Sequence, residues 1–341
     1  AVPGRVPDHG RSYRIGWCRD RLGGSRDCHG ALPPGYGRVA NQFPPTSGSR
    51  ASPTRLTSTM PDPQVLRDLA LEIASEVSPE LRARAGRASG IRTKSSETDL
   101  VSTTDSWSEE RIVTRLNEAR PYDEIVSEEG MRVSGTSGVR WLVDPIDGTT
   151  DFVYGHPGFS ISIGAEMDDE PIVGVVVDPL LDETFAAARG AGATRNGRPI
   201  GVSLQTGLSR ALVATGFGYH PDRRRRQAEG LVEILPRVGD IRRMGGAALD
   251  LAYVACGRVD AFFERGLATW DVAAGRVLVA EAGGEVLKLS LPRPRHEDDR
   301  LVCPLEDLHD LDDDTVVVAA GSGLIGQLTE LLIQAGAHEG P

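Results

Sequence analysis

Residues 141–150, Trp-Leu-Val-Asp-Pro-Ile-Asp-Gly-Thr-Thr, constrain the fold more than any other stretch of this chain. An apolar strand brings Asp144 to its end, and the proline that follows favours extended backbone at Asp144. Gly148 permits a tight turn, and Thr149 can then open a helix. The string therefore predicts that Asp144 and Asp147 face one pocket from a strand-to-helix turn.

This arrangement has a chemical use. Two carboxylates held together suit a hard cation such as Mg²⁺, which takes oxygen ligands. The backbone N–H groups of Gly148 and Thr149, at a helix start, suit a phosphate. The spacing Asp-x-x-Asp alone would equally describe a solvated turn with a threonine cap, but the full ten-residue string argues against that alternative.

Glu128 and Glu129 form a second acidic pair, which follows a strand-like run and precedes Gly130. Adjacent like charges repel unless a cation or solvent compensates them. Taken alone, the pair is typical of a solvated loop. The downstream string favours the alternative, in which Glu128 is a metal ligand.

Two more carboxylates leave both alternatives open. Asp271 lies at the N-cap or in the first turn of an apolar helix, where a cap is worth about 1 kcal/mol. It can also close a metal site from the second half of the chain. Asp105 is expected to cap a helix that starts near Trp107, and capping alone would explain it.

The first 59 residues differ from the rest in composition. They contain nine Arg and three Asp and no Lys or Glu, a net charge of +6, so the remainder carries −17. They lack the apolar core of a secretory signal. They are either a basic arm or transit segment, or upstream sequence translated ahead of a true start at Met60. Disorder is expected in both cases.

The remaining chain predicts two halves, residues 60–205 and 206–341. In the first half, Val65, Leu66, Leu69, Ile73 and Val77 have helical spacing. A second amphipathic helix covers residues 107–116, and a largely antiparallel sheet follows with strands at 124–127, 140–143, 159–165 and 172–177. Asn196-Gly197 indicates a turn.

The second half alternates strands and helices. Strands are expected at 211–214, 260–263, 285–289 and 315–319, and helices at 223–235, 249–257, 271–282 and 324–335. Residues 292–314 are rich in Pro and Asp and predict an irregular surface loop.

Composition excludes some classes of function. The net charge of −11 argues against non-specific nucleic-acid binding. No apolar run approaches the roughly 20 residues of a membrane-spanning helix. The four cysteines, Cys18, Cys28, Cys256 and Cys303, form no CxxC pair and no metal-ligand spacing, so free thiols in a reducing cytoplasm are expected.

Together these motifs resemble the inositol monophosphatase family. The resemblance rests on Trp-x-x-Asp-Pro-Ile-Asp-Gly-Thr, the upstream Glu-Glu, the downstream Trp-Asp-x-Ala-Ala-Gly and the segment 94–105. It covers roughly residues 62–335. It implies an α+β/α/β chain folded as a layered αβαβα sandwich of the inositol monophosphatase and fructose-1,6-bisphosphatase type, with the active site between the halves.

The resemblance also implies roles for single residues, with two or three Mg²⁺ ions in each site. Glu128, Asp144 and the carbonyl of Ile146 would hold the first ion. Asp144, Asp147 and Asp271 would hold the second, and a third would use Glu128. Thr149, paired with Asp105, would activate the attacking water. The residues implied to bind substrate are Gly148, Thr149, Gly245, Gly246, Ala247, Glu264 and Asp271.

The substrate is less constrained than the reaction, which is the hydrolysis of a phosphate monoester. Relatives that act on histidinol phosphate or adenosine 3′,5′-bisphosphate commonly carry Lys after Gly-Thr, where this chain has Thr150. That favours myo-inositol 1-phosphate. Residues 212–219 resemble bacterial members, actinobacterial ones in particular.

Two features leave alternative substrates open. Arg223–Arg226 could contact a second phosphate, as in a bisphosphate substrate, or could simply begin a solvated helix. Asp151 stands where the family usually has Asn, and its negative charge could favour an amine such as histidinol phosphate. A non-enzymatic scaffold would be expected to lack ligands that are present here. The resemblance further implies a cytoplasmic, lithium-sensitive homodimer.

Overall fold

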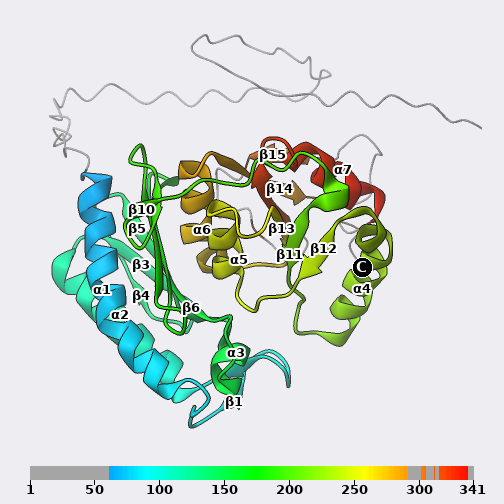
Figure 1. Cartoon of the computed structure of the whole chain (residues 1–341). Coiled ribbons are helices and arrows are strands. Elements are labelled where there is room, and N and C mark those ends of the chain that lie inside the picture. Colours follow the sequence, from blue (N-terminus) through cyan, green and yellow to red (C-terminus); the bar gives the residue numbers. More distant parts are fainter. Residues whose placement is uncertain (1–60, 291–300, 305–310, 312–314, 337–341) are drawn as a thin grey trace, which may run out of the picture. The chain divides into compact units, whose positions relative to one another are not determined.

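The computed structural model describes residues 61–290, 301–304, 311 and 315–336 (Figure 1). All the described residues belong to one structural unit. The expectation of disorder for residues 1–59 lies outside the described residues. Within the described ranges, no helix has both the length and the apolar character needed to cross a membrane.

The first layer contains the helices α1 (Pro63–Arg84) and α2 (Thr103–Ala119). Asp62 caps α1 by accepting a hydrogen bond from the backbone N–H of Gln64, at 2.9 Å. Helix α2 begins four residues earlier than its pattern predicted. Its cap is Ser102, and Asp105 lies in the first turn, where it accepts the Ser102 N–H at 2.9 Å. The prediction that Asp105 is the N-cap was therefore wrong. Ser102 is the N-cap, and Asp105 is the N3 residue of the same capping box.

An eight-stranded sheet forms the second layer, and it is antiparallel except where β3 pairs with β5. Asn196 and Gly197 have φ of 49° and 72°, which is the left-handed backbone that the predicted turn needs. The strands β8 to β10 were not predicted from the sequence. In spatial order the strands are β10 (Arg198–Pro199), β9 (Ala193–Arg195), β8 (Glu183–Ala188), β7 (Glu170–Asp178), β6 (Ser160–Met167), β5 (Val139–Asp147), β3 (Glu124–Ser127) and β4 (Arg132–Val133).

The middle layer consists of α5 (Ala247–Ala255) and α6 (Thr269–Glu281), which pack on each other. Helix α6 contacts β6 and β7 on one side and β14 on the other. All nine residues of α5 and residues 272–279 of α6 are buried. Such all-round burial is expected of a helix enclosed between two sheets.

A six-stranded mixed sheet forms the fourth layer. Its β15 lies within residues 292–314, so the prediction that this whole stretch is an irregular loop was wrong: residues 301–304 pair with β14. In spatial order the strands are β12 (Asp240–Arg242), β11 (Leu212–Thr215), β13 (Ala261–Arg265), β16 (Val316–Gly321), β14 (Gly284–Ser290) and β15 (Leu301–Pro304).

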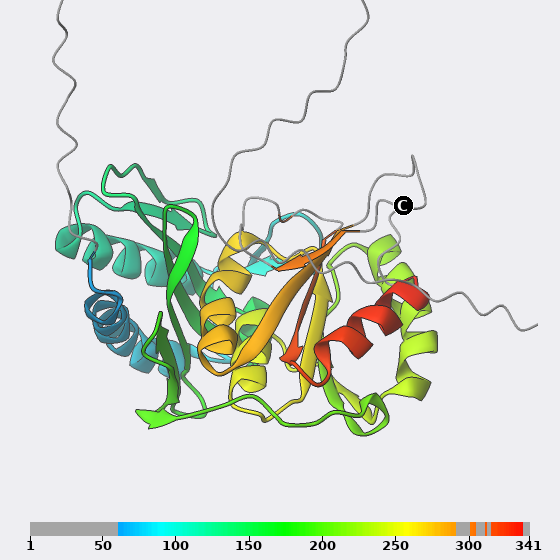
Figure 2. The same cartoon turned by 90° about the horizontal axis from the view of Figure 1, so that it is seen from above.

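Helices α4 (Pro221–Ile234) and α7 (Ile325–Gln334) form the last layer, on the far side of that sheet (Figure 2). Three separate apolar clusters fill the spaces between the layers. The layer order is therefore αβαβα, as the family resemblance implied. The short elements are β1 (Arg92–Thr93), β2 (Leu100–Val101), α3 (Thr149–Tyr154), η1 (Leu208–Arg210) and η2 (Leu235–Arg237).

Candidate active site

A bulge in β5 brings the two aspartates of the central string to the same face of the sheet. In a regular strand, side chains three residues apart point to opposite faces. Here Asp144 pairs with Ser162 and Asp147 with Ser160, so three steps on β5 match two on β6. The extra residue restores the phase. Asp144 and Asp147 therefore both face the middle helical layer.

The starts of the two middle helices meet these aspartates. Asp147 Oδ2 accepts a hydrogen bond from the backbone N–H of Ala248, in the first turn of α5, at 2.8 Å. Asp271 lies in the first turn of α6, where its Oδ2 accepts the Ala268 N–H at 2.7 Å. The positive ends of two helices thus border the carboxylates.

The acidic groups lie close enough to perturb one another. Burial first, and then the charges of Glu128, Asp147 and Asp271, raise the pKa of Asp144 well above its usual value. Burial is also the main cause that raises the pKa of Asp147 to about 7 and the pKa of Asp271. In the described part of the chain, no Lys or Arg forms an ion pair with Asp144, Asp147 or Asp271.

The oxygen donors of the site match the ligand preference of Mg²⁺, which favours carboxylate and carbonyl oxygens. Asp144, Asp147 and Asp271 have no ion-pair partner among the described residues, and the first two are buried, so their negative charge is left to be compensated. The described residues contain no group of three or more His, Cys, Asp or Glu side chains already arranged to hold a metal ion. The chemistry of the donors therefore fits, while their side chains are not gathered at one point.

Glu128 differs from the other predicted ligands because it has a cationic partner. Its Oε1 lies 2.9 Å from Lys94 Nζ, which also lies 2.5 Å from Oε1 of Glu129. Burial raises the pKa of Glu129 to about 7. Lys94 belongs to a segment that the motif includes, yet the sequence alone did not assign this lysine a role.

Thr149 and Asp105 come together as the motif implies. Thr149 Oγ1 lies 3.2 Å from Asp105 Oδ1 and 3.1 Å from the carbonyl oxygen of Ile146. Asp105 is fully buried and also accepts from the Ser102 hydroxyl at 2.6 Å. Burial is the largest influence on Asp105 and raises its pKa.

The two glycines before α5 lie directly against carboxylates. The family resemblance implied that Gly245 and Gly246 bind substrate, and this stays a prediction. A Cβ at Gly245 would lie 2.1 Å from Asp151 Oδ2, and one at Gly246 would lie 2.3 Å from Asp147 Oδ2. Their small size therefore admits these two carboxylates. Ala247 is buried at the start of α5.

Asp151 also has cationic neighbours. Its Oδ1 lies 3.3 Å from His156 Nδ1. Burial raises the pKa of Asp151, while Arg243 and His156 act in the opposite direction. This surrounding weakens the argument that Asp151 attracts an amine.

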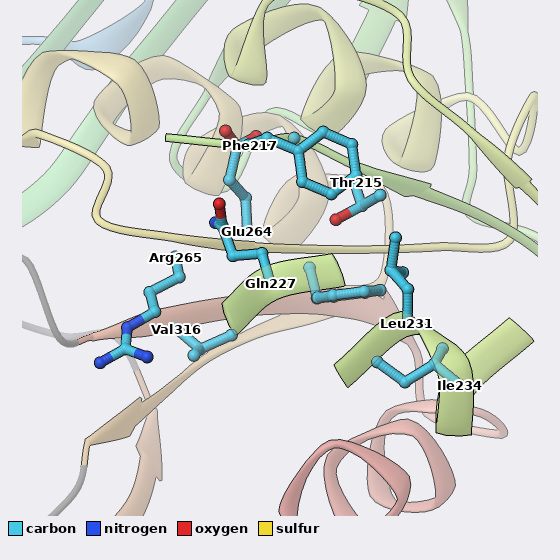
Figure 3. A pocket seen from close by; sticks show the side chains of 10 residues that line it. Thr215, Phe217, Gln227, Leu231, Ile234, Glu264, Arg265 and Val316 are labelled. Carbon is cyan, nitrogen blue, oxygen red and sulfur yellow. The ribbon is translucent and has the colours of Figure 1, made fainter. Parts of the chain in front are cut away.

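Glu264 reaches the site from β13, in the second sheet. Its carboxylate covers Gly216, where an added Cβ would lie 2.1 Å from Oε1. Burial raises the pKa of Glu264 to about 7, and the charge of Asp147 adds to the effect. A cavity of about 20 Å³ adjoins Glu264, with Thr215 and Gln227 among its lining residues (Figure 3). That is room for about one water molecule.

The segment from residue 216 to 223 borders the same site. Burial raises the pKa of Tyr219, and the charges of Asp99 and Asp147 contribute. The carbonyl oxygen of Tyr219 accepts a hydrogen bond from Thr98 Oγ1 at 3.0 Å. Arg223 packs against Gly218, where an added Cβ would meet its Cδ at 2.3 Å. Sequence patterns did not reveal the contribution of Tyr219.

A second cavity, of about 240 Å³, lies where β5 begins. Glu166 is buried beside it and pairs with Arg140 and with Arg276, the latter at 2.8 Å. Because Asp144 and Asp147 lie at the other end of β5, this cavity is not part of the carboxylate site.

With this geometry established, comparison with known proteins defines the class. The model of the inositol monophosphatase family matches residues 62–321. A curated protein of Mycobacterium tuberculosis, named inositol-1-monophosphatase SuhB, is 42% identical over 256 residues, which are 69% of this chain and 88% of that protein. A protein of Xylella fastidiosa, named Nus factor SuhB, is 44% identical over 192 residues, covering 56% of this chain and 70% of that protein.

Solved structures agree. The Mycobacterium tuberculosis SuhB structure has a TM-score of 0.66 at 35% identity and covers 82% of this chain and 99% of its own. The extragenic suppressor protein suhB from Bartonella henselae has a TM-score of 0.68 at 32% identity, covering 79% and 98%. This chain belongs to the inositol monophosphatase family, and its fold is the αβαβα sandwich of that family.

Proposed function

We propose that this protein hydrolyses small phosphate monoesters with the help of Mg²⁺, and that myo-inositol 1-phosphate is its preferred substrate. The observation that carries the proposal is that Asp144 and Asp147 share one face at the end of β5, while Asp147 and Asp271 each accept a backbone hydrogen bond at the start of a helix. None of the three has an ion-pair partner among the described residues. Family membership supports phosphatase activity independently.

The proposed ligands are oxygen atoms of Glu128, Asp144, Ile146 (carbonyl), Asp147 and Asp271. Bound Mg²⁺ would supply neutralising charge for the phosphate and for the leaving oxygen. Such stabilisation matters because phosphate-monoester hydrolysis is among the slowest uncatalysed reactions. Two or three ions per site, inhibition by lithium, a cytoplasmic location and a homodimer remain predictions.

In the proposed mechanism, Thr149 and Asp105 act together as the general base that removes a proton from the attacking water. Thr149 Oγ1 accepts a hydrogen bond from that water while its own proton points to Asp105 Oδ1, 3.2 Å away. Because burial raises the pKa of Asp105, this carboxylate is a stronger base than an exposed aspartate. The backbone N–H groups of Gly148 and Thr149 are proposed to orient the phosphate, and Glu264 the hydroxyl groups of the leaving alcohol.

Other substrates and roles are outcomes of the test. Histidinol phosphate, fructose 1,6-bisphosphate and adenosine 3′,5′-bisphosphate are the alternative esters. Some relatives are named Nus factor rather than enzyme, so a non-enzymatic role is the alternative of a different class. The presence of every expected carboxylate supports the enzymatic proposal.

The test compares kcat/KM for the four esters at one Mg²⁺ concentration. We expect myo-inositol 1-phosphate to be preferred. One unpaired hydrogen-bonding group costs about 1–3 kcal/mol, or roughly 5- to 150-fold, so side activities are expected. A tenfold or greater preference for histidinol phosphate would overturn the substrate assignment and leave the phosphatase assignment intact. No turnover of any ester would overturn both.

A further inference from the structure

Asp250 is a buried acidic residue to which the mechanism assigns no role. It lies in α5, with 1% of its surface exposed. Neither of its carboxyl oxygens has a hydrogen-bond partner among the described residues. A buried, charged carboxylate without a hydrogen-bond donor is strongly unfavourable. Asp250 must therefore be protonated or bind a group that donates a hydrogen bond to it.

The charged groups that act on Asp250 are mostly acidic. Glu264, Asp147 and Asp151 act on it with negative charge, and Arg243 is the cation that faces it. Arg243, however, donates to the carbonyl oxygen of Gly245 at 2.5 Å. The environment therefore favours the neutral acid at Asp250, which then has a proton to donate.

The carboxylate of Glu264 can accept a hydrogen bond but has no donor in the described part of the chain. The described residues provide no hydrogen bond to its carboxylate, which lies against Gly216 on one side and next to the cavity of about 20 Å³ on another (Figure 3). Helix α5, which carries Asp250, packs directly on β13, which carries Glu264. A proton on Asp250 would remove its buried charge and would also supply a hydrogen-bond donor for Glu264.

We propose that Asp250 is a positioning residue for Glu264, whose carboxylate it orients by donating a hydrogen bond to one bridging water molecule. The inference rests on the proposed function, in which Glu264 accepts hydrogen bonds from hydroxyl groups of the substrate. The selectivity for polyol phosphates would then depend on both Asp250 and Glu264, although only Glu264 contacts the substrate.

The test uses two variants of the full chain and two substrates. D250N keeps a donor of similar size, whereas D250L removes it. Phenyl phosphate has no ring hydroxyl for Glu264 to bind. For myo-inositol 1-phosphate we expect D250L to raise KM about tenfold at nearly unchanged kcat, the effect of one lost hydrogen bond. D250L should leave kcat/KM for phenyl phosphate unchanged, and D250N should behave as wild type with both substrates.

Three outcomes would overturn the proposal. The first is equal impairment of both substrates by D250L, which would indicate a structural role. The second is a D250N variant as impaired as D250L, which would mean that the donor is irrelevant. The third is a further rise in KM when D250L is added to E264Q, because the two changes should not add. If D250L does not fold, D250A removes the donor without adding volume. A wild-type chain that hydrolyses neither ester would refute the proposed function instead.

Discussion

Thr149 shows how much of the proposed chemistry depends on single atoms. Its hydroxyl has one proton and two acceptors in range, Asp105 Oδ1 at 3.2 Å and the Ile146 carbonyl oxygen at 3.1 Å. Thr149 has only 7% of its surface exposed, so solvent does not easily replace either contact. The direction of this one proton decides whether Asp105 is connected to the attacking water.

We expect T149A to lose about 10²- to 10⁴-fold in kcat, the usual contribution of a positioned proton acceptor. T149S retains the hydroxyl and should stay within about tenfold of wild type. Single-turnover kinetics at saturating Mg²⁺ measures the chemical step. Equal losses in T149S and T149A would mean that the methyl group matters, rather than the hydroxyl.

Asp147 is the second test at this scale. D147N should abolish nearly all turnover while the protein stays folded, because the amide keeps an acceptor for the Ala248 N–H but loses the charge proposed for Mg²⁺. Isothermal titration with Mg²⁺ should show weaker binding. D182N, in an exposed turn, is the control and should retain full activity. A folded D147N variant with near wild-type turnover would exclude this role for Asp147.

At the scale of elements, a charged contact ties β8 to the end of α5. Arg258 donates to both oxygens of Glu183 at 2.7 and 2.8 Å, and its guanidinium lies 4.4 Å from the centre of the Tyr253 ring. The hydrogen bonds from Arg258 lower the pKa of Glu183. A two-pronged contact of this kind is stronger than an ordinary surface ion pair.

We expect E183Q to lose about 1 kcal/mol of stability at pH 7. Because folding lowers the pKa of Glu183, its stabilisation is present above the unfolded value of about 4.3 and is lost as the pH falls through the folded value. The difference in Tm between wild type and E183Q should therefore shrink as the pH falls below the unfolded value and vanish once Glu183 is protonated in the folded state.

The control for this prediction is E170Q, which breaks the exposed pair of Glu170 and Arg189. An exposed pair contributes about 0–1 kcal/mol, so E170Q should change Tm less than E183Q. A difference between wild type and E183Q that persists at acid pH would show that the charge of Glu183 is not its source.

At the scale of the whole molecule, the site depends on how closely α6 approaches the first sheet. Gly164 and Gly174 are cross-strand partners in β6 and β7. A Cβ on Gly164 would lie 2.6 Å from that of Ala273, and one on Gly174 would lie 2.2 Å from the carbonyl oxygen of Ala274. This close approach brings Asp271, at the start of α6, to the bulge of β5.

G174A should therefore destabilise the fold by about 3 kcal/mol, because backbone atoms of α6 must shift. For a domain of this size that corresponds to a fall in Tm of about 6–12 °C. G201A is the control, since its added Cβ would meet nothing nearer than 3.7 Å. Thermal unfolding that is equal for the two variants would contradict the packing argument.

Local patterns predicted much of the architecture. The apolar spacing of α1, the Asn196-Gly197 turn and the alternating elements of the second half are local signals, and each was found. Strands β9 and β10 were missed because they are three and two residues long. Strand β8 was missed because its Ala-rich sequence has a low β propensity, so its burial comes from distant partners. Strand β15 was missed because its Pro-rich surroundings resemble a loop.

The grouping of carboxylates followed from motifs, since a strand end and a helix start have recognisable residues. The string predicted that Asp144 and Asp147 face one pocket, but the one-residue bulge that turns them to the same face appears only in the pairing of β5 with β6. The partners of Asp147 and Lys94, 101 and 34 residues away in sequence, likewise arise from packing. The physical reason is that burial and charge act through space between residues distant in sequence. The unpaired carboxyl of Asp250, for example, results from the packing of the layers and cannot be predicted from its local sequence.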